Sequence, residues 1–155
     1  MRKIISNVLP KEAGANYQGY KIALWIFMLI SIVSFVRSCI HIFAPDGGAG
    51  MIAGLDVSTG AENIYFGFAL WGSAQLIYAI IQIIVVFRYK ALVPLMYLVL
   101  VMETLLRILV GALKPPILLH TPPGAIANYI ILPLALFMFV LSVIRPQSSK
   151  GEKLS

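Results

Sequence analysis

Charged residues are scarce in this sequence. Asp, Glu, Lys and Arg make up 12% of its 155 residues, whereas apolar residues make up 60%. A soluble domain has roughly 25% charged residues, so this chain has too few to cover a surface in water. In their place it has long apolar runs that reach the roughly 20 residues a membrane-spanning helix needs. The composition therefore predicts an integral membrane protein.

Cysteine and the common catalytic motifs are also lacking. Cys39 is the only cysteine, which excludes an intrachain disulfide. The sequence has no Cys-x-x-Cys pair, phosphate-binding glycine loop, His-Glu-x-x-His or Gly-x-Ser-x-Gly motif. Cys39 and His41 would point to different sides of a helix, so they do not form a metal site. We therefore expect no metal and no cofactor.

Four apolar segments are present, and they predict four membrane helices. The predicted fold is an all-α, integral membrane four-helix bundle, in a single transmembrane domain over residues 1–155. Thr59 and Glu62 have the spacing of a capping box, which predicts that Thr59 is the N-cap of the second helix. The helices are expected at about 22–43, 60–87, 91–113 and 123–144.

The basic residues predict the orientation of the chain. Nine of them flank the spans on one side of the membrane, and only Lys114 lies on the other. Because cytoplasmic loops are enriched in Lys and Arg, both termini are expected in the cytoplasm of a cell membrane, with tails at 1–21 and 145–155. The net charge of +6 is explained by this topology and by anionic lipid headgroups, and we expect no nucleic-acid partner. The nine residues are Arg2, Lys3, Lys11, Lys21, Arg88, Lys90, Arg145, Lys150 and Lys153.

Four ionisable residues lie inside the predicted spans: Arg37, His41, Glu103 and Arg107. A charge at the centre of a membrane helix costs roughly 2.5–3.5 kcal/mol, so such residues face protein or water. Arg37 and His41 share one face of the first helix with three serines. Glu103 and Arg107 are four residues apart on the third helix, which favours an ion pair. Arg37 and Arg107 are expected at about the same depth, in the outer half of the bundle.

The second and fourth helices add neutral polar residues. Gln75 and Gln82 share a face with Trp71 and Tyr78. We interpret both glutamines as forming hydrogen bonds between helices. Asn128 lies near the outer end of the fourth helix.

Together these residues predict a polar pocket that opens away from the cytoplasm. Two arginines against one glutamate leave one positive charge, which an anionic amphiphile or a lipid headgroup could balance. Membrane lipids are thus the expected partners. The expected ligand-binding residues are Arg37, His41, Glu103, Arg107, Gln75 and Asn128.

Alternative interpretations remain open. The Glu103–Arg107 pair could be purely structural, and Arg37 could extend to the outer interface. The protein could be an enzyme that acts on a lipid-soluble substrate with Glu103 as acid/base. It could also be an accessory or purely structural subunit of a larger membrane complex, or a homo-oligomer.

The stretch 63–143 resembles a loosely defined group of small four-helix membrane proteins, the DoxX-like proteins. The resemblance lies in Asn63 followed by the small-residue run Gly67–Gly72, and in Glu103-x-x-x-Arg107 followed by Gly111. The resemblance implies an integral membrane protein, with the role of an accessory subunit as one expectation, and it implies no particular reaction.

Overall fold

The computed structural model describes residues 6–146 and consists of four long helices. They are α2 (Lys21–Phe43), α3 (Ala61–Phe87), α4 (Val93–Leu113) and α5 (Pro123–Val143), and the short 3-10 helix η1 (Lys90–Leu92) leads into α4. All four are long and apolar enough to cross a membrane. This confirms the predicted four-helix membrane bundle.

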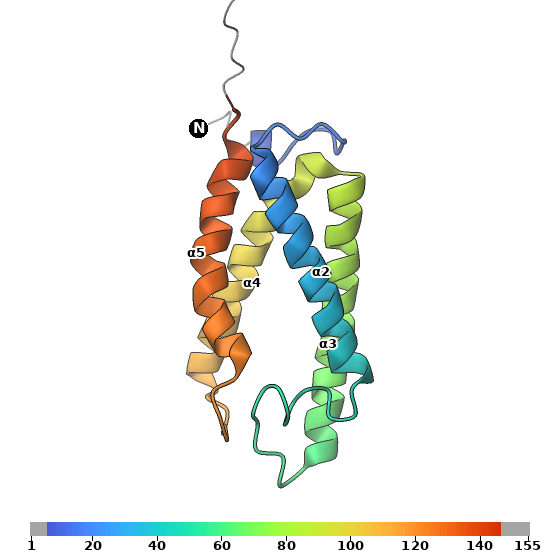
Figure 1. The fold of residues 1–155 in the computed structure, drawn as a ribbon, viewed down its shortest axis with the longest axis vertical. Coiled ribbons are helices and arrows are strands. Elements are labelled where there is room, and N and C mark those ends of the chain that lie inside the picture. Colours follow the sequence, from blue (N-terminus) through green and yellow to red (C-terminus); the bar gives the residue numbers. More distant parts are fainter. Residues whose placement is uncertain (1–5, 147–155) are drawn as a thin grey trace, which may run out of the picture.

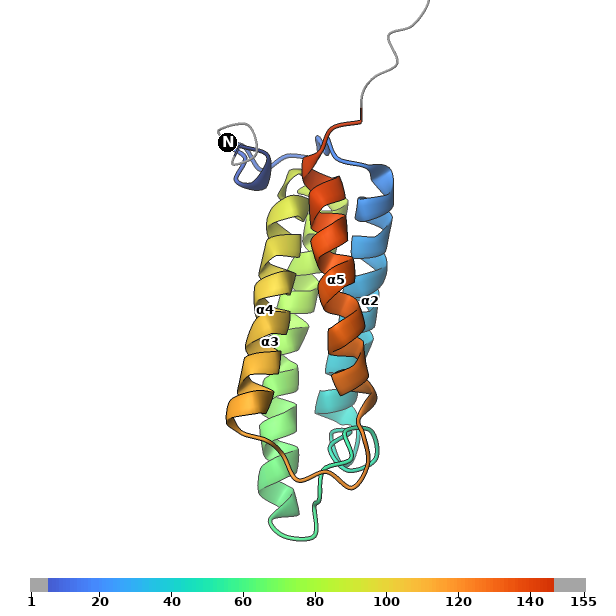
Figure 2. The same ribbon diagram turned by 90° about the vertical axis from the view of Figure 1, so that its left-hand side faces the viewer.

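The helices run up and down, so their connections gather at two ends (Figure 1, Figure 2). We call one the terminal end: it holds the segment before α2, the α3–α4 turn and the end of α5. The other, the loop end, holds the connections 44–60 and 114–122. The tail residues Arg2, Lys3, Lys150 and Lys153 lie outside the described residues.

Each helix boundary lies within two residues of its expected position, but the predicted capping box is wrong. The N-cap of α3 is Gly60, whose φ of 69° is left-handed, and no side chain caps this helix. Because α3 starts one residue later than expected, Thr59 stands outside the N-cap position. Its hydroxyl is therefore in the wrong place to accept from the free amides of the first turn.

Two helix pairs make up the bundle. α2 packs mainly against α3 and α4 mainly against α5, whereas contacts of α2 with α5 and of α3 with α4 are sparse. At Gly72 of α3 the first pair approaches closely: a Cβ atom there would lie 2.6 Å from the Cβ of His41. In Figure 1, α2 and α5 lie close together at the terminal end and diverge toward the loop end.

The close-packed apolar core lies in the half of the bundle near the terminal end. Phe27 and Tyr97 are fully buried there, with ring centroids 5.1 Å apart. The Tyr97 hydroxyl donates to the Ala23 carbonyl at 2.7 Å, which ties α4 to α2. The segment before α2 is bound to the end of α5, because the Tyr20 amide donates to the Leu141 carbonyl at 3.0 Å. The two pairs are therefore joined firmly at this end.

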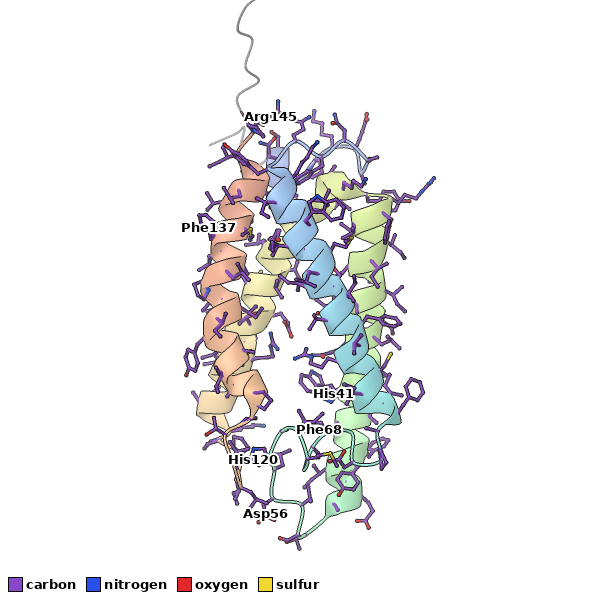
Figure 3. The ribbon with its side chains drawn as sticks, in the orientation of Figure 1. His41, Asp56, Phe68, His120, Phe137 and Arg145 are labelled. Atoms are coloured by element: carbon purple, nitrogen blue, oxygen red, sulfur yellow. The ribbon has the colours of Figure 1, made fainter. Side chains whose placement is uncertain are left out.

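The outer surface of the bundle is apolar, as a lipid environment requires. Phe137 projects away from the other helices (Figure 3) and is exposed, as are Leu136 on the same helix and Phe66 and Leu70 on α3. In water such an apolar surface would favour aggregation. In a bilayer it faces the acyl chains.

A compact turn follows α2 at the loop end. The Asp46 carboxylate accepts backbone hydrogen bonds from Met51 at 2.9 Å, Gly48 at 2.8 Å and Gly50 at 3.2 Å. These amides stabilise the ionised carboxylate and lower the pKa of Asp46 below its usual value. The turn is therefore stabilised at neutral pH, and this stabilisation is lost as acid protonates the carboxylate.

The two connections at the loop end are joined to each other. Leu55 and Leu118 form an isolated antiparallel bridge, in which the Leu119 amide donates to the Gly54 carbonyl at 2.7 Å. His120 packs on Gly54, where a Cβ atom would lie 2.9 Å or less from three His120 atoms. Figure 3 shows His120 and Asp56 in these connections. The bridge thus links the α2–α3 pair to the α4–α5 pair at the end where the helices have diverged.

The contact at Gly72 makes a testable prediction. Gly72→Ala should destabilise the protein by about 1–3 kcal/mol, because the added methyl forces α2 away from α3. Gly67→Ala on the same helix is the matched control, since a Cβ there meets nothing within 4 Å. Thermal unfolding of the purified variants measures the difference. Equal stabilities of the two variants would show that the α2–α3 contact is looser than described.

Candidate functional site

Arg37 points from α2 onto α3. Its Nη2 donates to Oε1 of Gln75 at 2.7 Å, and its guanidinium carbon lies 5.5 Å from the Trp71 ring centroid. A cation over an indole face contributes roughly 0.5–2 kcal/mol, most where water is excluded. Arg37 is thus held by α3 through these two contacts. The interhelical role expected for Gln75 is confirmed.

The polar face of α2 is buried, as expected. Ser31 and Ser38 have no exposed surface, and their hydroxyls donate to the Phe27 and Ser34 carbonyls one turn earlier, at 2.8 and 2.7 Å. These bonds satisfy each hydroxyl within α2 itself. The serines on this face therefore need no partner on another helix, and Arg37 is the residue of the face that forms a hydrogen bond to α3.

Glu103 and Arg107 form the predicted ion pair on α4. Arg107 Nη2 lies 3.1 Å from Glu103 Oε2 and donates to the Thr104 hydroxyl at 3.3 Å. The Nε of Arg107 is buried without a hydrogen-bond partner. Arg37 lies within electrostatic range of both Arg107 and Glu103. The three charges predicted from the sequence are therefore brought together.

A cavity of about 270 Å³ lies beside these charges, and we call it the seam cavity. Leu29 and Val33 of α2 line it and are also more than half exposed on the outer surface. With the sparse contacts between α2 and α5, this places an opening toward lipid along that seam. Its polar lining is Ser34, Arg37, Gln75, Tyr78, Gln82, Glu103 and Arg107; its apolar lining is Ile26, Leu29, Ile30, Val33, Leu100, Ile131 and Leu134.

Two polar residues in the seam cavity lack hydrogen-bond partners. Gln82 is fully buried, and neither its amide nitrogen nor its amide oxygen is paired. The Tyr78 hydroxyl lies near it, one turn earlier on α3, yet outside hydrogen-bonding geometry. The interpretation of Gln82 as an interhelical hydrogen-bonding residue is therefore wrong. The residues of α5 that line the cavity, Ile131 and Leu134, are aliphatic and offer Gln82 no side-chain partner.

A second, larger cavity of about 660 Å³ lies between α3, α4 and the loop end, and we call it the vestibule. Its walls are mainly apolar and include Phe68, Trp71 and Val110, and the bridged residues Leu55 and Leu118 also line it. Glu103 and Arg107 line both cavities. The ion pair therefore stands at the boundary between the vestibule and the seam cavity.

Two residues expected in the site lie elsewhere. His41 is buried, and its Nδ1 is 2.7 Å from the Gly47 carbonyl. Its ring packs against those of Phe68 and Trp71 at centroid distances of 5.4 and 4.9 Å, and these two rings also contact each other at 5.8 Å (Figure 3). It supports Trp71 and anchors the turn after α2. Asn128 is half-buried on α5 and lines neither cavity.

Tyr78 and Gln82 were not expected in the site, although a signal for both is present in the sequence. They share a helix face with Gln75, and that face meets the cavity. In residues 6–146, no three His, Cys, Asp or Glu side chains come close enough to hold a metal ion. The site can therefore bind by charge and hydrogen bonds.

No protein-family model, curated protein or solved structure matches this chain. The resemblance to DoxX-like proteins stays a prediction.

Removing the Arg37 partner should destabilise the bundle. Gln75→Leu leaves the guanidinium without its acceptor at low dielectric, which should cost about 1.5–3 kcal/mol. Arg37→Met in the same chain removes the charge as well, so the double variant should be more stable than the sum of the single losses predicts. A double-mutant cycle of thermal unfolding measures this coupling. Additive losses would mean that the two side chains do not interact.

Proposed function

We propose that the protein binds an anionic amphiphile, with the anion at the Arg37 end of the seam cavity. The observation behind this proposal is the charge at the site: Arg37 and Arg107 against Glu103 alone. Glu62 is exposed at the start of α3 and does not line the cavity, so it leaves this balance unchanged.

An anion is the natural complement of this charge. Arg107 is already engaged by Glu103, whereas Arg37 has only neutral partners, the Gln75 oxygen and the Trp71 ring. A guanidinium presents several donors in a planar fork that fits carboxylate or phosphate. A bound anion would compensate the cost of keeping the uncompensated charge within the membrane.

The other walls support an amphiphile over a small inorganic ion. Half of the seam-cavity lining is aliphatic, and its opening between α2 and α5 faces the region of the acyl chains. An apolar chain would pack against residues such as Ile30, Val33 and Ile131, and each buried methylene would contribute about 0.8 kcal/mol. A ligand dissolved in the bilayer would thus reach the site sideways.

We further propose that the terminal end faces the cytoplasm, which would make the site lie in the outer half of the membrane. The support is the distribution of Lys and Arg in the described residues, with Lys11, Lys21, Arg88, Lys90 and Arg145 at the terminal end against Lys114 at the loop end. In a Cys39→Ser background, Lys114→Cys should react with a membrane-impermeant maleimide in intact cells. Arg88→Cys should react only after lysis, and the reverse pattern would contradict this orientation.

The other predicted functions are an enzyme that uses Glu103 and a structural or accessory subunit. They stay predictions, since the site offers no observation that favours either over binding.

Thermal unfolding in nanodiscs of zwitterionic lipid tests the binding proposal. Octyl phosphate should stabilise the protein, by about 2.7 kcal/mol at a hundred times its dissociation constant. Octylphosphocholine, which has the same chain but no net charge, should stabilise it much less. Equal effects of the two amphiphiles would contradict recognition of the anion.

Variants at Arg37 test whether octyl phosphate stabilises the protein by binding at this residue. Arg37→Gln should lose most of the stabilisation by octyl phosphate, while Arg37→Lys, which keeps the charge without the planar fork, should retain part of it. Arg88→Gln is the matched control, because Arg88 is an exposed arginine at the terminal end. A full response to octyl phosphate in Arg37→Gln would show that the anion binds elsewhere.

A further inference from the structure

We infer that the ligand carries a second polar group, a neutral hydroxyl, carbonyl or amide, which Gln82 and Tyr78 recognise at the far end of the seam cavity. This inference rests on the proposed function and specifies the ligand further. Arg37 would hold the anion at one end, and the α3 side chains would hold the neutral group at the other.

Gln82 is the observation that points to such a group. Its side chain has no exposed surface, lines the cavity and has neither its donor nor its acceptor paired. Buried amides in proteins are almost always paired with protein or ordered water. The Tyr78 hydroxyl beside it is also unpaired. Three unpaired hydrogen-bonding atoms, the amide nitrogen and oxygen of Gln82 and the hydroxyl of Tyr78, therefore lie at one end of the cavity.

The distance along α3 between Gln75 and Gln82 gives the expected separation of the two polar groups of the ligand. Gln75, which holds Arg37, and Gln82 are almost two turns apart, which is about 10 Å at 1.5 Å per residue. The α2 and α5 walls are mainly aliphatic, with Ile30, Val33 and Leu134, and Ser34 is the neutral polar residue among them. The ligand inferred from this arrangement is an anion, an apolar chain of about eight carbons spanning those 10 Å, and a terminal hydrogen-bonding group.

The unpaired amide of Gln82 should make the site distinguish a ligand whose chain ends in a methyl group from one whose chain ends in a hydroxyl. In the absence of ligand, the amide of Gln82 has neither a protein partner nor surface that water can reach. A chain that ends in a methyl group leaves the amide unpaired, whereas a terminal hydroxyl supplies the hydrogen-bond partner that the amide lacks. The site should therefore reject the simple alkyl ligand in favour of its hydroxylated analogue.

Binding of octyl phosphate and ω-hydroxyoctyl phosphate to the full chain in zwitterionic nanodiscs, followed by calorimetry, tests this inference. The wild-type protein should bind the hydroxylated compound about tenfold more tightly, which corresponds to about 1.4 kcal/mol. Gln82→Leu should abolish this preference and leave the affinity for octyl phosphate unchanged or higher. Arg37→Gln should weaken both compounds equally and preserve their ratio.

If Gln82→Leu does not fold, a second variant can still test the inference. Tyr78→Phe removes only a hydroxyl and should reduce the preference without changing the affinity for octyl phosphate. If octyl phosphate binds but the wild type shows no preference for the hydroxylated compound, the inference is wrong and the proposed function stands. A preference that survives in both α3 variants also overturns the inference. If neither compound binds, the proposed function itself fails.

Discussion

The close contact of α2 with α3 at Gly72 is the constraint on which the rest of the structure depends. It presses the polar face of α2 against α3, where Arg37 meets Gln75 and Trp71. As a result, α2 packs mainly against α3. Because α4 likewise packs mainly against α5, the contacts between the two pairs are few where the pairs diverge. The cavities lie along those weakly packed seams.

The two halves of the bundle differ in packing because apolar side chains gather in one half and charged side chains in the other. Toward the terminal end, Phe27, Tyr97 and their neighbours pack into an apolar core. Toward the loop end, the interior contains the charges of Arg37, Glu103 and Arg107. A dry, close-packed interior there would bury Arg37 and Arg107 at high cost. Open space between the helix pairs is the less costly arrangement.

Much of this could be predicted from the sequence, because hydropathy and depth are local properties. The helix boundaries follow from where apolar runs meet proline, glycine or charge, and the i, i+4 spacing alone predicts the Glu103–Arg107 pair. The mistakes concern which helix faces which. Periodicity shows that Gln82 lies on a polar face, but only the relative placement of α2, α3 and α5 shows that no partner faces it. The same holds for His41, which packs on Gly72 and Trp71, and for Asn128, which lies away from both cavities.

The bridge between Leu55 and Leu118 has a kinetic consequence. It fastens the two helix pairs at the loop end, as the core fastens them at the terminal end. With both ends fixed, the pairs cannot swing apart as rigid bodies, and passage through the seam depends on the flanking side chains Leu29 and Val33. Rotamer changes of exposed side chains take picoseconds to nanoseconds, whereas helix displacements take microseconds or longer. Entry into the site is therefore expected to be fast, and the lifetime of a bound molecule to be set by its own polar contacts.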